Sequence, residues 1–256
     1  IDIAIDLKGY TKNSRTGIFA YRAAPIQINF LGYPGTLGAI FFDYIIADLT
    51  LIPETKKNFY SEEIIYMPYT YQPTSHSFVT SNKIFTKSEM HLPKESFVFC
   101  CFNNSYKISP IEFGIWMRIL NKVENSVLWL FGSNKWAKKN LIKEAENHGI
   151  ESKRLIFANQ LPHSDHLSRL KLADLFLDTF NVNAHTTTSD ALWAGTPVIT
   201  KLGNSFASRV AASILKAIGM PELITQNEKE YENLILEIAN SPIKLSKIKE
   251  KLSFNK

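Results

Sequence analysis

Hydrophobic and polar positions follow a strand pattern through the first quarter of the chain. Apolar residues alternate with polar or small ones at the start, which predicts a strand with one apolar face; the apolar positions are Ile1, Ile3, Ile5 and Leu7. Three further runs have the length of strands: residues 26–31, 44–47 and 64–67. A turn-rich segment at 32–36 follows the first of these runs. The pattern then fades over residues 68–93, which we interpret as a connection between two lobes.

Beyond this connection, strand-like and helix-like segments alternate regularly. We expect strands at residues 97–102, 126–131, 155–158, 175–178 and 198–200. We expect helices after Ser109-Pro110 and over residues 136–148, 165–172, 187–194 and 208–218. Serine before proline is typical of a capped helix start. Alternation of this kind implies parallel strands joined by right-handed crossovers, so the sequence predicts a doubly wound α/β lobe.

Composition narrows the class of protein. The chain has 256 residues and a formal charge of +5, and the lysines are scattered, which favours a solvated surface over a nucleic-acid footprint. Hydrophobic residues make up 45% and no apolar run approaches the roughly 18 residues of a membrane span. We therefore expect neither nucleic acid nor membrane as a partner. The adjacent Cys100 and Cys101 point to opposite faces of a strand, which predicts reduced core thiols in a reducing compartment.

Candidate chemistry lies in the loops that follow the predicted strands. In a doubly wound lobe, ligands bind beyond the carboxyl ends of the strands. Four of these loops carry polar donors or cations: residues 103–107, 159–166, 179–190 and 201–205. Their convergence on one edge of one sheet predicts a binding site there, although each residue alone has an ordinary structural alternative.

The run from His185 to Asp190 opens a predicted helix. Thr186 or Thr187 is expected to cap it, and its first backbone N–H groups then form an anion site. Phosphate binding there gains roughly 0.3–1 kcal/mol from the helix dipole. Lys107, just past a buried strand, could reach a diphosphate as a point charge. The alternatives are ordinary capping residues and a solvated lysine.

Other chemistries find little support. The sequence has no Gly-x-Gly-x-x-Gly after a strand, no phosphate-loop lysine motif and no Gly-x-Ser-x-Gly elbow. His163 and His166 lie three apart without a nearby glutamate or cysteine, which makes a zinc site improbable. They could instead bond a base, ribose or phosphate. Diphosphate binding by a lysine and a helix end suggests catalysis without a metal, so we expect no metal and no cofactor.

Many segments together resemble the catalytic region of the protein O-GlcNAc transferase/SPINDLY family. They are RAAPIQ at 22–27, LGYPGT at 31–36, DYII at 43–46, YSE at 60–62, YMP at 66–68, FNN at 102–104, YKI at 106–108, NSVLWL at 125–130, LAD at 172–174, LDT at 177–179, HTT at 185–187, DALWAGTP at 190–197, ASRVAAS at 207–213 and PELI at 221–224. The resemblance therefore extends over almost the whole chain.

The resemblance implies a GT-B fold of two Rossmann-like lobes, with the N-terminal lobe incomplete. Residues 1–90 would be the C-terminal part of the N-terminal catalytic lobe, and residues 91–256 the nucleotide-sugar-binding lobe. It further implies an inverting, metal-independent transfer of N-acetylglucosamine from UDP-GlcNAc to Ser or Thr hydroxyls of acceptor proteins, in the cytoplasm. The same resemblance leads us to expect upstream tetratricopeptide repeats, histidines and an aspartate, so the chain resembles a fragment with little or no transfer activity of its own.

Residue roles carry over from the resemblance by position. Lys107 would stabilise the departing diphosphate, and Asn104 stands near the uracil and ribose where the family usually has glutamine. His166 matches a histidine that stacks on the base, and His163 stands where relatives carry lysine. The remaining matches form two groups: the phosphate and ribose residues His185, Thr186, Thr187 and Asp190, and the sugar or acceptor residues Leu31, Gly32 and Pro34.

Three alternatives remain open at this point. Plant SPINDLY proteins transfer fucose from GDP-fucose, although His185 before the threonines favours the N-acetylglucosamine branch. A non-catalytic nucleotide-sugar-binding module would keep the same site without the chemistry. A hydrolase or epimerase would need a pair of catalytic carboxylates, and the sequence offers no clear pair.

Overall fold

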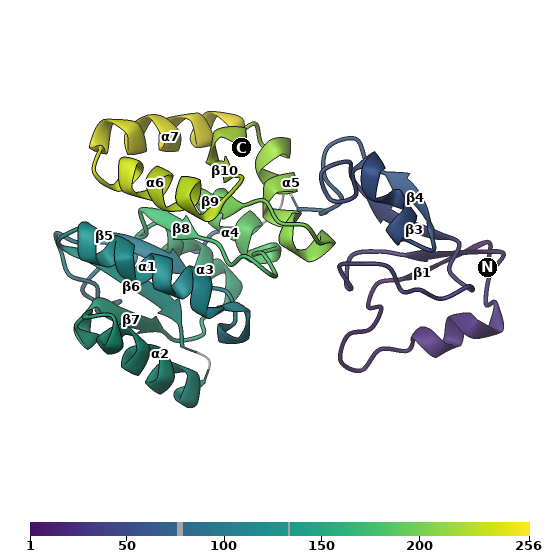
Figure 1. Cartoon of the computed structure of the whole chain (residues 1–256), viewed down its shortest axis with the longest axis horizontal. Coiled ribbons are helices and arrows are strands. Elements are labelled where there is room, and N and C mark those ends of the chain that lie inside the picture. Colours follow the sequence, from purple (N-terminus) through teal and green to yellow (C-terminus); the bar gives the residue numbers. More distant parts are fainter. Residues whose placement is uncertain (76–78, 133) are drawn as a thin grey trace.

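The protein folds into two lobes, each built around its own parallel sheet (Figure 1). The structure is a computed structural model that describes residues 1–75, 79–132 and 134–256. The first lobe has four strands: β1 (Ile3–Asp6), β2 (Ile26–Asn29), β3 (Tyr44–Ala47) and β4 (Glu63–Tyr66). They lie side by side in chain order and all pairs are parallel. Two 3-10 helices accompany them, η1 (Thr16–Tyr21) and η2 (Glu54–Phe59).

The strand expected at residues 26–31 ends earlier, at Asn29. Leu31 has a φ of 71°, in the left-handed region, and the backbone N–H of Gly32 donates to the carbonyl of Phe30. This turn takes Leu31 out of the strand and begins the 32–36 loop, whereas the backbone N–H of Phe30 still donates to the carbonyl of Asp6 at 3.0 Å. The apolar run therefore continues past the last strand residue, and Leu31 packs against the apolar core.

The predicted apolar face of β1 is exposed rather than buried. Ile3 is 52% exposed and Ile5 is 46% exposed, whereas Asp6 on the opposite face is only 6% exposed. The Asp6 carboxylate accepts bonds from the backbone N–H groups of Lys8 and Gly9, which fixes the turn after the strand. β1 is an edge strand, and within the described residues no element covers its apolar side.

The second lobe has the strand order of a doubly wound fold. Its strands are β5 (Phe97–Cys101), β6 (Ser126–Phe131), β7 (Leu155–Ala158), β8 (Leu175–Leu177), β9 (Val198–Lys201) and β10 (Ile224–Thr225). The spatial order is β10-β9-β8-β5-β6-β7, with every pair parallel. The chain reverses its direction of progress between β5 and β8, so the topological switch point lies between these two strands. The five strands expected here are confirmed, and β10 was not expected.

Seven α-helices are described in this lobe: α1 (Pro110–Lys122), α2 (Lys135–Asn147), α3 (His163–Leu170), α4 (Thr186–Ala194), α5 (Val210–Ala217), α6 (Glu228–Ala239) and α7 (Pro242–Asn255). The Ser109 cap is confirmed as a capping box with Glu112. α3 begins at His163, two residues before the expected start, because the helix follows Pro162 directly. α6 and α7 were missed, although Asn227 and Ser241 cap them through their side chains.

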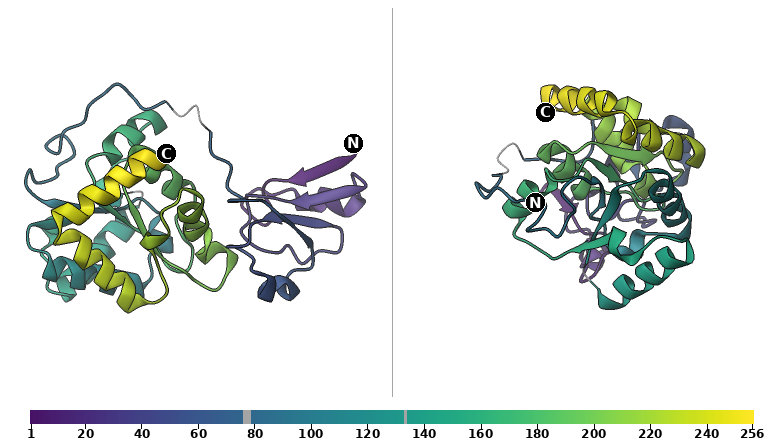
Figure 2. Two further views of the ribbon diagram at one scale, coloured as in Figure 1. Left: turned by 90° about the horizontal axis from the view of Figure 1, so that it is seen from above. Right: turned by 90° about the vertical axis from the view of Figure 1, so that its left-hand side faces the viewer.

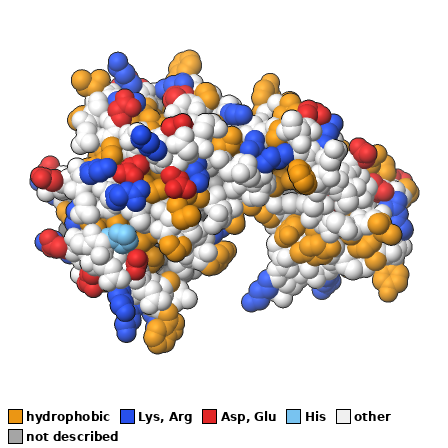
Figure 3. Space-filling view, viewed as in Figure 1, with side chains coloured by type: hydrophobic (Ala, Val, Ile, Leu, Met, Phe, Trp, Pro, Cys, Tyr) orange, Lys and Arg blue, Asp and Glu red, His pale blue; other side chains and the backbone are white. Residues whose placement is uncertain are grey.

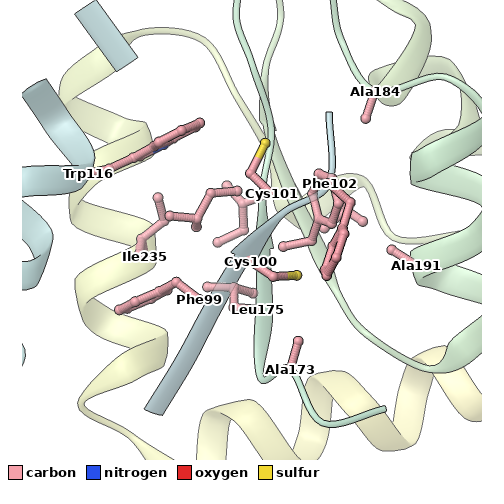
Figure 4. Close-up of a cluster of buried hydrophobic side chains, with 14 of the residues drawn as sticks. Phe99, Cys100, Cys101, Phe102, Trp116, Ala173, Leu175, Ala184, Ala191 and Ile235 are labelled. Carbon is pink, nitrogen blue, oxygen red and sulfur yellow. The ribbon is translucent and has the colours of Figure 1, made fainter. Parts of the chain in front are cut away.

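The core of the second lobe surrounds β5. In Figure 4, Trp116 and Ile235 lie on one side of this strand, and Ala184 and Ala191 lie on the other. All four are buried, as expected for a central strand covered on both faces by helices. Cys100 and Cys101 are buried free thiols within the strand, facing opposite sides. The sequence-based prediction of core thiols without a disulfide is confirmed.

The two lobes are joined by a long connection and by direct hydrogen bonds. Among the described residues between β4 and β5 there is no helix or strand; this connection runs beside the second lobe (Figure 2), where the backbone N–H of Ser81 donates to the carbonyl of Ser164. Across the lobes, the Asp48 carboxylate accepts a bond of 2.6 Å from the Ser213 hydroxyl, and the Arg209 Nε donates to a carbonyl of the first lobe at 2.5 Å. Figure 3 shows a notch between the lobes.

No helix of the described chain has the length and apolar character that a membrane span requires.

Candidate functional site

The candidate site begins at the switch point between β5 and β8. Asn103 follows β5, and its side-chain amide donates to the Thr179 hydroxyl at 2.8 Å, just beyond β8. Asn103 is 3% exposed, and its carbonyl oxygen accepts a bond of 2.7 Å from the Thr187 hydroxyl at the start of α4. One buried amide therefore joins the ends of both central strands to the first turn of a helix.

Lys107 approaches the same strand ends from the short 3-10 helix η3 (Ser105–Lys107). Its ammonium donates to the carbonyl of Asn183 at 2.9 Å. Burial lowers the pKa of Lys107, an effect that the nearby Asp178 carboxylate opposes. An ammonium in this position retains further donors for an anionic group. The structure thus places the predicted lysine beside the loop that precedes α4.

The N-terminus of α4 differs from the expected threonine cap. His185 occupies the cap position and, among the described residues, no side chain caps the helix. The Thr187 hydroxyl bonds Asn103 instead, because the loop brings it against the end of β5, and Thr186 is exposed. The prediction that a threonine caps this helix is therefore wrong, and the helix start lies beside Asn103 at the end of β5.

His185 is partly buried beside this helix start. Its Nε2 lies 3.3 Å from the carbonyl oxygen of Ala207, so the ring donates a proton there. Burial, together with the Lys107 charge, lowers the pKa of His185 to about 4. The imidazole is consequently neutral near pH 7, with its other nitrogen as an acceptor.

A pocket of about 390 Å³ lies beyond the ends of β5, β6 and β7. Its lining is mainly aromatic and apolar, with cationic and imidazole groups: Phe102, Phe131, Gln160, Leu161, Pro162, His163, His166 and Arg169. The Arg169 guanidinium lies 5.1 Å from the centre of the Phe102 ring, and its Nε donates to the Nδ1 of His166 at 3.0 Å. His166 therefore carries its proton on Nε2, and burial lowers its pKa to about 4. A planar heteroaromatic ring suits such a pocket.

Three of the predicted polar residues, Asp190, His163 and Asn104, have partners within the protein. The Asp190 carboxylate is buried and lies 2.9 Å from the Nε2 of His163. Burial raises the pKa of Asp190, and the histidine opposes that rise. Asn104 is exposed, and its amide lies 3.4 Å from the Tyr106 hydroxyl. Asp190 and His163 thus form a pair at the rim of the pocket, whereas Asn104 lies on the surface.

The residues predicted in the first lobe lie on the 31–36 loop. A side chain at Gly32 would place its Cβ 2.1 Å from the carbonyl oxygen of Leu7, so only glycine fits this approach. Pro34 lines a second pocket, of about 460 Å³, together with Lys56 and with Phe206 of the second lobe. This pocket spans both lobes, and Leu31 packs against the main apolar core instead.

Sequence reasoning placed Asn103 in a candidate loop but gave no individual role to four residues of this arrangement: Phe102, Asn103, Arg169 and Asp178. Asn103 and Asp178 both directly follow or end an apolar strand, and that position alone could have indicated them. Arg169 lies inside a helix, where nothing in the local sequence reveals that it reaches the pocket. Among the described residues, no group of three or more His, Cys, Asp or Glu side chains is placed to hold a metal ion.

A family model of known proteins matches this chain over its whole length. The model is Glycosyl transferase family 41, and it matches residues 1–82 and 72–256. The chain belongs to glycosyltransferase family 41. The predicted family is therefore confirmed.

Several curated members of family 41 are similar to the chain. A probable UDP-N-acetylglucosamine–peptide N-acetylglucosaminyltransferase SEC of Arabidopsis thaliana is 36% identical over 98% of the chain. A probable transferase of the same description, SPINDLY of Petunia hybrida, is 33% identical over 98% of the chain. The chain covers 26% and 27% of these two proteins, so it spans about a quarter of their length.

Solved structures agree with the fold. A Thermobaculum terrenum O-GlcNAc transferase mutant superimposes with a TM-score of 0.89 at 27% identity, covering the whole chain and 48% of that protein. The GtfA/B complex superimposes with a TM-score of 0.57 at 10% identity, a likeness of fold alone. The predicted α/β fold of the GT-B class is confirmed, while the predicted boundary at residue 90 stays a prediction.

Proposed function

We propose that this chain forms the nucleotide-sugar site of a family 41 enzyme that transfers N-acetylglucosamine from UDP-GlcNAc to Ser or Thr hydroxyls of proteins. The names of the similar curated proteins describe this donor and a peptide acceptor. The activity is proposed by analogy with these relatives, of which the chain spans about a quarter.

One arrangement carries the proposal: a lysine and an uncapped helix start meet at the switch point, next to an aromatic pocket. Lys107 and the first turn of α4 converge on the same loop, which suits a diphosphate. The pocket around His166 and Arg169 suits the base. A nucleoside diphosphate would lie with its base in that pocket and its phosphates between the lysine and the helix.

The chemistry follows from this placement. The acceptor hydroxyl oxygen attacks C1 of the sugar and gives up its proton to a general base or to water. The bond from C1 to the diphosphate oxygen breaks, and UDP departs with the electron pair. Attack from the face opposite the departing group inverts the configuration at C1. Lys107 would stabilise the charge that builds on the diphosphate, so no metal ion is needed for that role. His185, neutral near pH 7, would bind a phosphate oxygen by turning its ring proton away from the Ala207 carbonyl, and Asp190 would approach the ribose.

Calorimetric titration of the chain with UDP and with GDP, in the presence of chelator, tests the proposal. We expect UDP to bind with micromolar affinity, about −8 kcal/mol, and GDP to bind much more weakly. Retention of that affinity with chelator supports the metal-independent mechanism. Preference for GDP would support the fucosyl alternative, and binding of neither ligand would contradict the assignment of the site.

Catalysis is tested separately from binding. Transfer to a peptide acceptor, measured in the longest form of the protein that contains this chain, should fall far more on Lys107→Met substitution than UDP affinity does. Equal losses of affinity and turnover would favour the non-catalytic binding module.

A further inference from the structure

Asp178 is a fully buried carboxyl group at the centre of the lobe that the proposed chemistry leaves without a role. It lies at the end of β8 with no exposed surface. Burial raises the pKa of this carboxyl to about 7. A buried acid is costly unless it is hydrogen-bonded, and such groups are concentrated at functional sites. Its contacts therefore need an explanation.

The carboxylate closes the loop that leads from β8 to α4. Its Oδ1 accepts a bond of 2.8 Å from the backbone N–H of Thr179, at the start of the loop. The same oxygen accepts a bond of 2.6 Å from the backbone N–H of Ala184, at the end of the loop. Its Oδ2 accepts a bond of 2.7 Å from the Thr200 hydroxyl on β9. One side chain thus fixes both ends of the loop and ties them to the neighbouring strand.

The closed loop presents both anion-binding groups. Asn183, held inside it by a bond from its amide to the Thr179 carbonyl, offers its own carbonyl to Lys107. Asn103 lies 3.4 Å from Oδ1 of Asp178 and accepts the Thr187 hydroxyl of α4. Lys107 is therefore linked to the atoms that Asp178 holds through Asn183, and the start of α4 is linked to them through Asn103.

We propose that Asp178 is a positioning residue for the diphosphate: its side chain holds the 179–184 loop in the shape that aligns Lys107 with the first turn of α4. The inference rests on the proposed function, because it assumes that a diphosphate binds there. It assigns Asp178 no contact with the ligand. What the site needs from Asp178 is a hydrogen-bond acceptor of this shape, not its charge.

The groups around the carboxyl show what an asparagine at this position would keep and what it would lose. Lys107 is the cation that faces it, and His185 is neutral near pH 7 because its pKa is about 4. From α6, the Tyr231 hydroxyl donates to the backbone carbonyl of Asp178, not to its side chain. Cys101 on β5 is a buried thiol whose raised pKa keeps it uncharged. An asparagine at position 178 could keep the two backbone bonds through its carbonyl oxygen.

Two substitutions and two ligands test the inference by calorimetry on the whole chain. Asp178→Ala removes the acceptor, and we expect the Kd for UDP to rise at least about tenfold while the Kd for uridine changes less than about threefold. Uridine reports on the base pocket, which Asp178 does not touch. Asp178→Asn keeps the acceptor, and we expect UDP affinity within about threefold of the unsubstituted chain.

Several results of these titrations would overturn the inference. Equal loss of UDP and uridine in Asp178→Ala would show general damage, and equal loss of UDP in both variants would show that charge matters; either result overturns the inference. Unchanged UDP binding in Asp178→Ala does so as well. Failure of the unsubstituted chain to bind UDP would overturn the proposed function itself, and the inference with it.

A second variant covers the case in which Asp178→Ala does not fold, as judged by circular dichroism. Asn103→Ala leaves the Asp178 bonds that close the loop but removes the Asn103 bonds to Thr179 and Thr187. We expect the same selective loss, with UDP affected at least about fivefold more than uridine. Equal effects on the two ligands, or no effect, would overturn the inference.

Discussion

Replacing Lys107 with methionine removes one positive charge from the site while keeping a long, flexible side chain. In the structure, the ammonium is partly buried and makes a bond of 2.9 Å to the Asn183 carbonyl. That bond uses one of its three donors, so the others remain for a diphosphate oxygen. We expect the substitution to weaken UDP binding without preventing folding.

The size of the effect follows from the type of bond. A charge-assisted hydrogen bond contributes roughly 1.5–3 kcal/mol, which corresponds to a rise in Kd of about 10- to 150-fold. The substitution removes one hydrogen bond to a carbonyl, which lowers the free energy of unfolding. It also removes a partly buried charge, and burial of that charge is unfavourable, as its lowered pKa indicates. We therefore expect the Tm to fall by no more than about 4 °C.

The assay is calorimetric titration with UDP and with uridine, alongside thermal unfolding. Lys247→Met is the matched control, because Lys247 is exposed on α7 and belongs to none of the pockets described. The control should leave both affinities unchanged. Uridine binding should change little in either variant, since the base pocket does not contain Lys107.

Two results would refute this reasoning. If Lys107→Met binds UDP within threefold of the unsubstituted chain, the lysine does not contact the diphosphate. If the variant loses uridine and UDP equally, or if its Tm falls by much more than about 4 °C, then Lys107 supports the fold and not the ligand.

Three further predictions concern acid, the base pocket and the loop of the first lobe. The pKa of His166 is about 4 in the folded state and about 6.5 when unfolded. The free energy of unfolding should therefore fall by up to about 3 kcal/mol as the pH drops from 6.5 to 4. Urea midpoints at pH 7 and 5 should differ less in His166→Gln than in the unsubstituted chain, and an equal difference would contradict the neutral ring. Arg169→Lys should cost about 1–2 kcal/mol and weaken uridine binding, because lysine cannot stack and bond the imidazole together; unchanged urea unfolding and uridine titration would contradict this. Gly32→Ala should destabilise the protein by about 1–3 kcal/mol in urea unfolding, since its Cβ would clash with Leu7, whereas Gly17→Ala, with open space around it, should not; similar costs for both would contradict the close approach.

The sequence by itself determined the local elements and the class of fold. The alternation of apolar runs with amphipathic segments specified parallel strands joined by helices, and Ser109 specified the start of α1 through its capping box. These features depend on residues close together in the chain, where periodicity and capping act. The positions of Lys107 and His185 beyond strand ends could be predicted in the same way.

Two local features were predicted differently from what the structure shows, because the local sequence pattern was ambiguous. The alternation at Ile3 and Ile5 predicted a face that could be buried, and it is exposed because no described element packs against that side of β1. The expected threonine cap failed for a related reason: the tertiary fold brings Thr187 to Asn103, 84 residues away in the sequence. A distant partner then replaced the local one.

Tertiary structure alone decided how the site is assembled. Asn103 and Thr179 are 76 residues apart in the sequence, yet they meet because the switch point places β5 beside β8. In the sequence, Asp178 is only the polar residue that ends an apolar run. Its proposed role depends on the folded structure, in which both ends of the following loop donate hydrogen bonds to its carboxylate. Periodicity determines which face of an element is apolar, whereas the pairing of strands far apart in the chain determines which polar groups share a crevice.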